Sequence, residues 1–190
     1  MSTTGFAGMI FDLVIIFAFQ AIYGYVFSWI GILVAFFMVG AAGGAMWTTL
    51  TRTEQRNSLK LFIKIELLLI GISIGLPFAL ETINALPTSP GTFFISEMAF
   101  LVLSFICGFA TGSQFPLANT LSLRTSPSLS QTAGLLYAAD LLGGWLGGII
   151  GAIVLLPVLG LVGTCITVAL LKLASGIVFA TQSQSAGISA

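Results

Sequence analysis

The sequence has few charged residues and no histidine. Only 6% of its 190 residues are charged and 57% are hydrophobic, whereas about 25% of a soluble domain is charged. A surface so poor in charge does not stay dissolved in water, so we expect the chain to lie in lipid. Without histidine the usual acid–base catalyst, zinc ligand and haem ligand are missing, and the serines lack a companion base. The sequence therefore favours a membrane protein that is not an enzyme and holds no metal or cofactor.

Cysteine is also scarce, and neither sign of charge is in excess. Cys107 and Cys165 lie in separate apolar runs, a placement typical of buried thiols that act as small apolar side chains and not of a disulfide or a metal site. Six basic and six acidic side chains give a net charge of zero. We therefore expect the lipid bilayer, and not nucleic acid, as a partner.

Long apolar runs, separated by short polar breaks, fill most of the chain. A helix needs roughly 20 apolar residues to cross the hydrocarbon core. The runs predict an all-α, polytopic membrane bundle of six helices over residues 1–182, with a polar tail at 183–190. The helices are expected at residues 5–25, 28–50, 59–82, 93–113, 131–157 and 160–181.

The basic residues predict the orientation of these helices. With six spans they all fall on one side, and the outer loops contain none. By the positive-inside bias both termini are then cytoplasmic. Three helices followed by three of opposite sense also permit an inverted repeat. The residues that carry this prediction are Arg52, Arg56, Lys60, Lys64, Arg124 and Lys172.

An aspartate lies within the apolar stretch GLLYAADLLGGWLGGIIGA, residues 134–152. Glycines follow Asp140 at offsets that stay on one face of a helix, and Tyr137 extends the same face. Such a stripe allows close helix packing, which is the plainest interpretation of the glycines themselves. Gly40 and Gly44 form a second, shorter pair. The stripe consists of Gly143, Gly144, Gly147, Gly148 and Gly151.

The aspartate itself needs a further explanation. An ionised carboxylate near mid-membrane costs roughly 2.5–3.5 kcal/mol, so Asp140 is expected to face protein or water and to have a partner. A tight turn joins the last two helices, so we predict that they are antiparallel neighbours with an Asp140–Lys172 ion pair. Alternatively, Lys172 extends to the cytoplasmic interface, and Tyr137, Gln114 or water holds Asp140.

Further ionisable side chains are expected in the inner half of the bundle. Asp12 lies about a turn and a half into the first expected helix, and Lys64 and Glu66 lie near the start of the third. For each of these alone, solvation at the interface is the plainer interpretation. Together with Asp140 and Lys172 they predict a cytoplasm-facing polar cavity with a slight acidic excess, suited to a cation or a proton.

Three stretches resemble a known family. These are ILVAFFMVGAAGGAMW at 32–47, GFATGSQFPLAN at 108–119 and GLLYAADLLGGWLGGIIGAIVLLPVLG at 134–160. They are similar to the membrane-spanning part of spermidine-synthase-like proteins, also described as fused transporter/spermidine synthases. The resemblance implies a bacterial inner-membrane bundle that is normally attached to a soluble aminopropyltransferase-like domain. The sequence shows no such domain, so we do not expect aminopropyl transfer, and Lys172 stands where relatives tend to have Asn or another polar residue.

Two functions remain open from the sequence. In the first, the chain is a membrane subunit whose polar site around Asp140 binds or passes a small cationic or polar metabolite, or a proton. In the second, it is a structural subunit of a larger membrane assembly, for example an electron-transfer complex. Either function predicts further partners: other membrane subunits, a second copy, or a separate soluble or cofactor-carrying chain.

Overall fold

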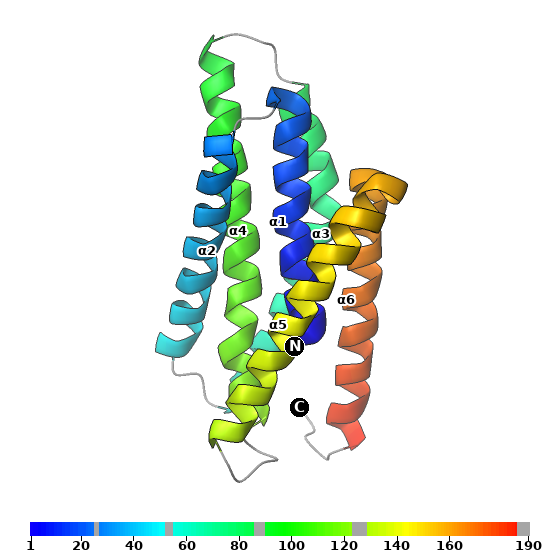
Figure 1. Ribbon diagram of the computed structural model, residues 1–190. Coiled ribbons are helices and arrows are strands. Elements are labelled where there is room, and N and C mark those ends of the chain that lie inside the picture. The colour runs from blue at the N-terminus through cyan, green and yellow to red at the C-terminus, as the bar shows by residue number, and fades with distance from the viewer. Residues whose placement is uncertain (25–26, 52–54, 86–89, 123–128, 186–190) are drawn as a thin grey trace.

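The protein is a bundle of long helices (Figure 1). The computed structural model describes residues 1–24, 27–51, 55–85, 90–122 and 129–185, and the predicted all-helical fold is confirmed over these residues. Consecutive α-helices run in opposite directions. The elements are α1 (Ser2–Tyr23), α2 (Phe27–Leu50), α3 (Gln55–Asn84), α4 (Pro90–Ser122), α5 (Leu129–Ile150), the π-helical segment η1 (Gly151–Leu159) and α6 (Gly160–Ser185).

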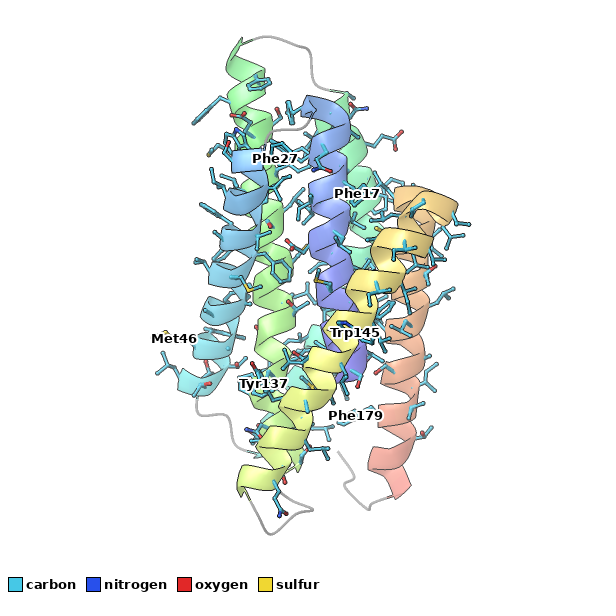
Figure 2. All side chains as sticks on the ribbon, viewed as in Figure 1. Phe17, Phe27, Met46, Tyr137, Trp145 and Phe179 are labelled. Atoms are coloured by element: carbon cyan, nitrogen blue, oxygen red, sulfur yellow. The ribbon has the colours of Figure 1, made fainter. Side chains whose placement is uncertain are left out.

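Five helical stretches are long and apolar enough to cross a membrane. The fifth, Gln131–Phe179, contains most of α5, all of η1 and most of α6, and Figure 1 shows this stretch folding back on itself. Large apolar side chains such as Phe27, Met46 and Trp145 are more than 60% exposed and project from the surface of the bundle (Figure 2). This surface suits lipid and not water, so the chain is compatible with an integral membrane protein.

Helix α1 lies at the centre of the bundle (Figure 1), and every other helical element packs against it. Its sequence is apolar on all sides, as expected of a helix that is surrounded by protein. Phe11 and Phe19 are fully enclosed, and the Phe19 ring meets the Phe100 ring edge to face at 5.3 Å between centroids. The polar side chains of α1 therefore face other helices.

The turn between α5 and α6 is wider than an α-helical turn. Pro157 lies inside η1, and a proline has no N–H to donate to the preceding turn. The π-helical segment contains this break, and Gly160 ends it with φ 68°, a left-handed conformation that glycine adopts at little cost. Helix α5 then leans onto α1, whereas α6 packs against α3 and α1. Within the described residues, α5 and α6 do not pack against each other.

Several helix ends differ from those expected. Helix α1 begins at Ser2, so Asp12 lies at the middle of this 22-residue helix and not near its inner end, as expected. Helix α4 continues through Pro116 to Ser122, nine residues beyond the expected end, so Gln114 is helical. Of the basic residues that predict the orientation, Arg52 and Arg124 lie outside the described residues.

Candidate functional site

Four polar side chains from four different helices meet inside the bundle. Thr4 comes from α1, Glu66 from α3, Gln114 from α4 and Lys172 from α6. The Lys172 ammonium nitrogen lies 2.9 Å from a Glu66 carboxylate oxygen, 3.0 Å from the Gln114 side-chain oxygen and 3.3 Å from the Thr4 hydroxyl. All four residues are buried, and Lys172 and Gln114 are fully enclosed. We call these four residues the buried network.

Each polar group of the buried network binds a neighbour. The Thr4 hydroxyl donates a hydrogen bond of 2.7 Å to the Gln114 side-chain oxygen, and the Gln114 amide donates to the same Glu66 oxygen that receives Lys172. A buried ion pair is stable only when further hydrogen bonds satisfy it, and here an amide and a hydroxyl supply them. The charges of Glu66 and Lys172 cancel, so the network is neutral overall.

The predicted Asp140–Lys172 ion pair is wrong. The prediction assumed that α5 and α6 are packed neighbours, but α5 leans onto α1 while α6 faces α3. Lys172 therefore forms its ion pair with Glu66. Oδ1 of Asp140 is buried and has no hydrogen-bond partner among the described residues.

The alternative partners considered for Asp140 are engaged elsewhere. Gln114 belongs to the buried network. Tyr137 is 57% exposed, and its ring packs edge to face on Phe115, with 6.2 Å between centroids. Lys64 is exposed on α3 and takes no part in the buried network. The structure thus brings Glu66, Gln114 and Lys172 together and leaves Asp140 apart from them.

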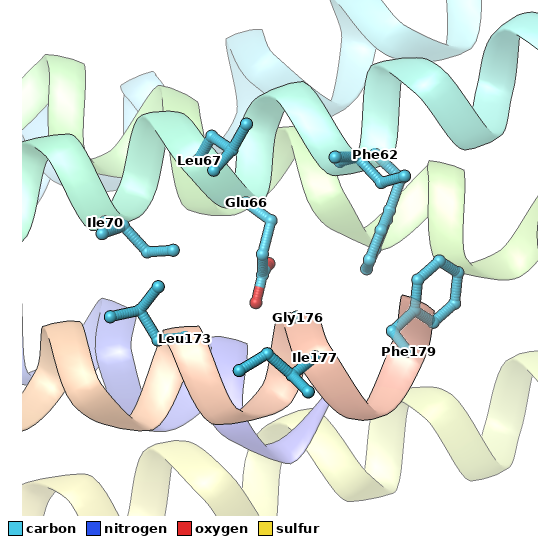
Figure 3. Close-up of a pocket in the computed structure, with 9 residues that line it drawn as sticks. Phe62, Glu66, Leu67, Ile70, Leu173, Gly176, Ile177 and Phe179 are labelled. Carbon is cyan, nitrogen blue, oxygen red and sulfur yellow. The ribbon is translucent and has the colours of Figure 1, made fainter. Parts of the chain in front are cut away.

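An apolar groove of about 210 Å³ runs between α3 and α6 (Figure 3). The Glu66 side chain reaches across it toward α6, where Gly176 leaves room: a Cβ atom on Gly176 would lie 3.6 Å from Glu66 Cγ. The Phe62 and Phe179 rings close one end, with 4.7 Å between centroids. Apart from the Glu66 carboxylate, which is bound by Lys172 and Gln114, the groove has an apolar lining.

A larger cavity, of about 430 Å³, lies between α1, α2, α4 and α5. Both Asp12 and Asp140 line it, and so do Thr4 and Thr111. Asp12 is 6% exposed, and its Oδ1 also has no hydrogen-bond partner among the described residues. Met1 lies in the same wall, and its amino group interacts electrostatically with Asp140. Nowhere in the described ranges do three or more His, Cys, Asp or Glu side chains gather as they would around a metal ion.

Glycines bring the helices around this cavity into backbone contact. A Cβ atom on Gly143 or Gly147 would strike the backbone of α1, and one on Gly40 or Gly44 would strike the backbone of α4. Gly151 packs instead on the Ile10 side chain. The contacts at the other two glycines of the stripe are ordinary: a Cβ would lie 3.7 Å from the nearest atom at Gly144 and 3.5 Å at Gly148.

The backbone contacts between α1 and α5 recur between α4 and α2. Three contacts of the first pair have counterparts in the second. Adding 103 to a residue number in α1 gives the matching residue in α4, and subtracting 103 from a number in α5 gives the matching residue in α2. Gly5 packs on the Asp140 carbonyl, and its counterpart Gly108 packs on the Phe37 carbonyl. Gly143 packs on the backbone of Ser2 as Gly40 packs on that of Phe105. Gly147 packs on the backbone of Phe6 as Gly44 packs on that of Phe109. The residues that the sequence analysis missed here are Gly5, Gly108 and Gly112. The identical tripeptide GFA at 5–7 and 108–110 is the signal that could have revealed the first two.

The cavity lining follows the same shift of 103 residues. Gly8 and Thr111 both line the cavity, as do Met9 and Gly112. Two further matched pairs differ in chemistry: Asp12 corresponds to Phe115, and Asp140 corresponds to Phe37, and all four residues line the cavity. The α1–α5 side therefore carries both acids, and the α4–α2 side carries two phenylalanines at the corresponding positions.

No match to this chain was found among family models, among characterised proteins or among solved structures. The likeness to spermidine-synthase-like membrane domains therefore rests on the quoted stretches alone.

Proposed function

We propose that this chain is an integral membrane protein that binds a small cation in the cavity between α1, α2, α4 and α5 and passes it through the membrane. One observation carries the proposal: Asp12 and Asp140 line a single cavity, and each has a buried oxygen that finds no hydrogen-bond partner in the part of the chain that the structure describes. Acids at membrane depth are costly and normally pair with an ion or mark its path. A cation in the cavity would supply the missing partner to both.

The buried network supports this assignment by exclusion. Lys172 is fully enclosed in the bundle, and its ammonium group contacts Glu66, Gln114 and Thr4. It does not line the cavity. Glu66 neutralises Lys172, so of the two positive groups that act on Asp140, the Met1 amino group and Lys172, the Met1 amino group is the one that a bound cation meets in the cavity.

For the membrane topology we infer six crossings, with α5 and α6 as separate spans and both termini cytoplasmic. The left-handed turn at Gly160 and the fold-back of this stretch in Figure 1 support two crossings there. Lys60 and Lys64 are exposed near the start of α3, where the positive-inside bias favours the cytoplasm. The resemblance to spermidine-synthase-like membrane domains favours a bacterial inner membrane.

We also infer that the bundle consists of two inverted halves, α1–α3 and α4–α6. The matched glycine contacts and the shared GFA tripeptide, all related by 103 residues, support this repeat. Corresponding helices run in opposite directions (Figure 1), as an inverted repeat requires. Transporters of this kind hold their cargo at the interface of the two halves, and the cavity is lined by α1 and α2 of one half and by α4 and α5 of the other. The repeat therefore favours transport over the scaffold alternative.

The proposal is tested with methylammonium as the probe cation. The purified protein in lipid nanodiscs is titrated calorimetrically, and uptake into proteoliposomes is measured with the radiolabelled ion. Asp12→Asn and Asp140→Asn should each weaken binding at least ten-fold, because a hydrogen bond to a charged group contributes roughly 1.5–3 kcal/mol. Glu81→Gln removes an acid that lines a separate pocket and is the matched control, for which binding should be unchanged.

Two results would count against the proposal. If methylammonium neither binds nor enters, or if the Asp12 and Asp140 variants behave like Glu81→Gln, the acids do not form a cation site. A membrane partner that co-purifies in fixed proportion, and is lost in the Asp140→Asn variant, would instead support the structural-subunit alternative.

A further inference from the structure

Both acids of the cavity lie on one wall, which also includes Trp145, and Phe37 and Phe115 lie on the other, which also includes Thr111. Helices α1 and α5 pack on each other through Gly5 and Gly143, and α2 and α4 pack through Gly40 and Gly108. Each pair contributes one side of the cavity lining. At positions related by 103 residues, the first pair presents carboxyl groups and the second presents phenyl rings. The two walls thus have matching backbone contacts, but at the matched positions one wall carries carboxyl groups and the other carries phenyl rings.

This asymmetry discriminates between kinds of cation. An inorganic ion such as K⁺ needs a shell of oxygen atoms that replaces its water, and the side chains of the α2–α4 wall offer only the Thr111 hydroxyl beside the two phenyl rings. The face of a phenyl ring attracts a cation, most strongly when the cation is desolvated, and it also packs well against alkyl groups. The two acids occupy only the opposite wall. A cation with both a charged end and an apolar part satisfies both walls at once.

The acids themselves point to a donor of hydrogen bonds. Oδ1 of Asp12 and Oδ1 of Asp140 are acceptors without donors among the described residues, and an ammonium group carries N–H donors. We propose that the cargo of this cavity is an alkylammonium ion. Its ammonium group binds the Asp12–Asp140 wall, and its carbon chain packs against Phe37 and Phe115. This inference rests on the cation-binding function proposed above and specifies its substrate class.

The test compares three monovalent cations that differ in apolar surface: K⁺, methylammonium and butylammonium. Binding to the protein in nanodiscs is measured by calorimetry at constant ionic strength. Each buried methylene adds roughly a factor of four in affinity at most, so butylammonium should bind at least ten-fold more tightly than methylammonium. K⁺ should be the weakest of the three.

Aromatic variants then locate the apolar contact. Phe115→Ala alters a half-buried ring and Phe37→Leu alters the shape of a buried one while leaving the position apolar. Each should reduce the preference for butylammonium over methylammonium by about five-fold, because the carbon chain of butylammonium then buries less apolar surface, at about 0.8 kcal/mol for each methylene. Phe36→Ala, at an exposed position next to Phe37, is the control and should leave the preference unchanged.

The outcomes separate this inference from the function on which it rests. Equal affinities for butylammonium and methylammonium, or tighter binding of K⁺, would overturn the alkylammonium assignment. Methylammonium binding that still depends on Asp12 and Asp140 would then leave the cation site standing. If no cation binds at all, the function itself fails, and the aromatic variants have no bearing on that result.

Discussion

The bundle contains two polar regions, the buried network and the cavity, that differ in how completely their buried charged groups are hydrogen-bonded. In the buried network, Lys172 contacts Glu66, Gln114 and Thr4 within 3.3 Å. In the cavity, Asp12 and Asp140 each keep an oxygen without a partner among the described residues. Both regions lie between helices that are long and apolar enough to cross a membrane, and Thr4 belongs to both. In the buried network a side chain of the protein pairs with the acid, whereas in the cavity one oxygen of each acid receives no hydrogen bond from the described residues, although the Met1 amino group acts electrostatically on Asp140.

This difference separates a structural role from a functional one. A buried ion pair with its hydrogen bonds complete holds helices together, and it is lost cooperatively when one member is removed. A buried acid with an oxygen that receives no hydrogen bond carries a desolvation cost that lowers the stability of the folded state. We therefore expect substitutions in the buried network to affect folding, and substitutions in the cavity to affect binding.

The largest effect should follow from breaking the buried network. Lys172→Met leaves the Glu66 carboxylate buried without a counter-charge, which should lower the free energy of unfolding by about 3–5 kcal/mol. Unfolding in a denaturing detergent, followed by circular dichroism, measures it. Lys64→Met, at an exposed position on α3, should change the free energy of unfolding by less than about 0.5 kcal/mol.

A double substitution distinguishes loss of an ion pair from loss of packing. Replacing both members, Glu66→Leu with Lys172→Met, removes the uncompensated charge, and exchanging a buried pair for apolar residues is often nearly neutral. The double variant should recover most of the lost stability. If it is as unstable as Lys172→Met alone, the buried network is not held together by the charge pair.

Much of the fold is visible in the sequence because lipid imposes a simple rule. A chain with 6% charged residues must satisfy its backbone within helices, and the apolar runs mark where those helices lie. The isolated acids and the glycine stripe could also be identified in the sequence, because they interrupt these apolar runs. The extension of α4 through Pro116 was not predicted, because a proline in a membrane helix marks no end when neighbouring helices enclose it.

The sequence alone could not predict that Lys172 pairs with Glu66. A short turn between α5 and α6 suggested that they are neighbours, but the helix axes diverge from the π-helical segment that contains Pro157. Which acid meets Lys172 depends on that angle, and the angle depends on glycine contacts between helices far apart in the chain. The tripeptide GFA at 5–7 and 108–110 was the available clue, because it marks corresponding positions in α1 and α4.

The next prediction uses this correspondence to move an acid from one wall of the cavity to the other. Asp140→Phe should weaken methylammonium binding at least ten-fold, or about 1.4 kcal/mol. Adding Phe37→Asp restores a carboxyl group at the matched position, whose backbone packs on Gly108 as that of Asp140 packs on Gly5. Calorimetry should show the double variant within about three-fold of the original protein.

A neighbouring position provides the control for this exchange. Met38 also lines the cavity but does not correspond to Asp140. Asp140→Phe combined with Met38→Asp should remain as weak as Asp140→Phe alone. Equal recovery from Met38 and Phe37 would mean that the cavity accepts any added acid, and the matched contacts would then say nothing about binding.

The smallest expected effect is an increase in the free energy of unfolding, opposite in sign to the effect of Lys172→Met. It tests most directly whether the cavity differs from the buried network. Asp12→Asn replaces a carboxyl group that is 6% exposed, and has an unpartnered oxygen, with a neutral amide of the same shape. Because an unpaired buried charge opposes folding, the free energy of unfolding without ligand should stay the same or rise by up to about 1 kcal/mol. Detergent unfolding measures it. Lower stability in Asp12→Asn would show that the chain uses this acid to hold itself together, as it uses Glu66. The two polar regions would then not differ in kind.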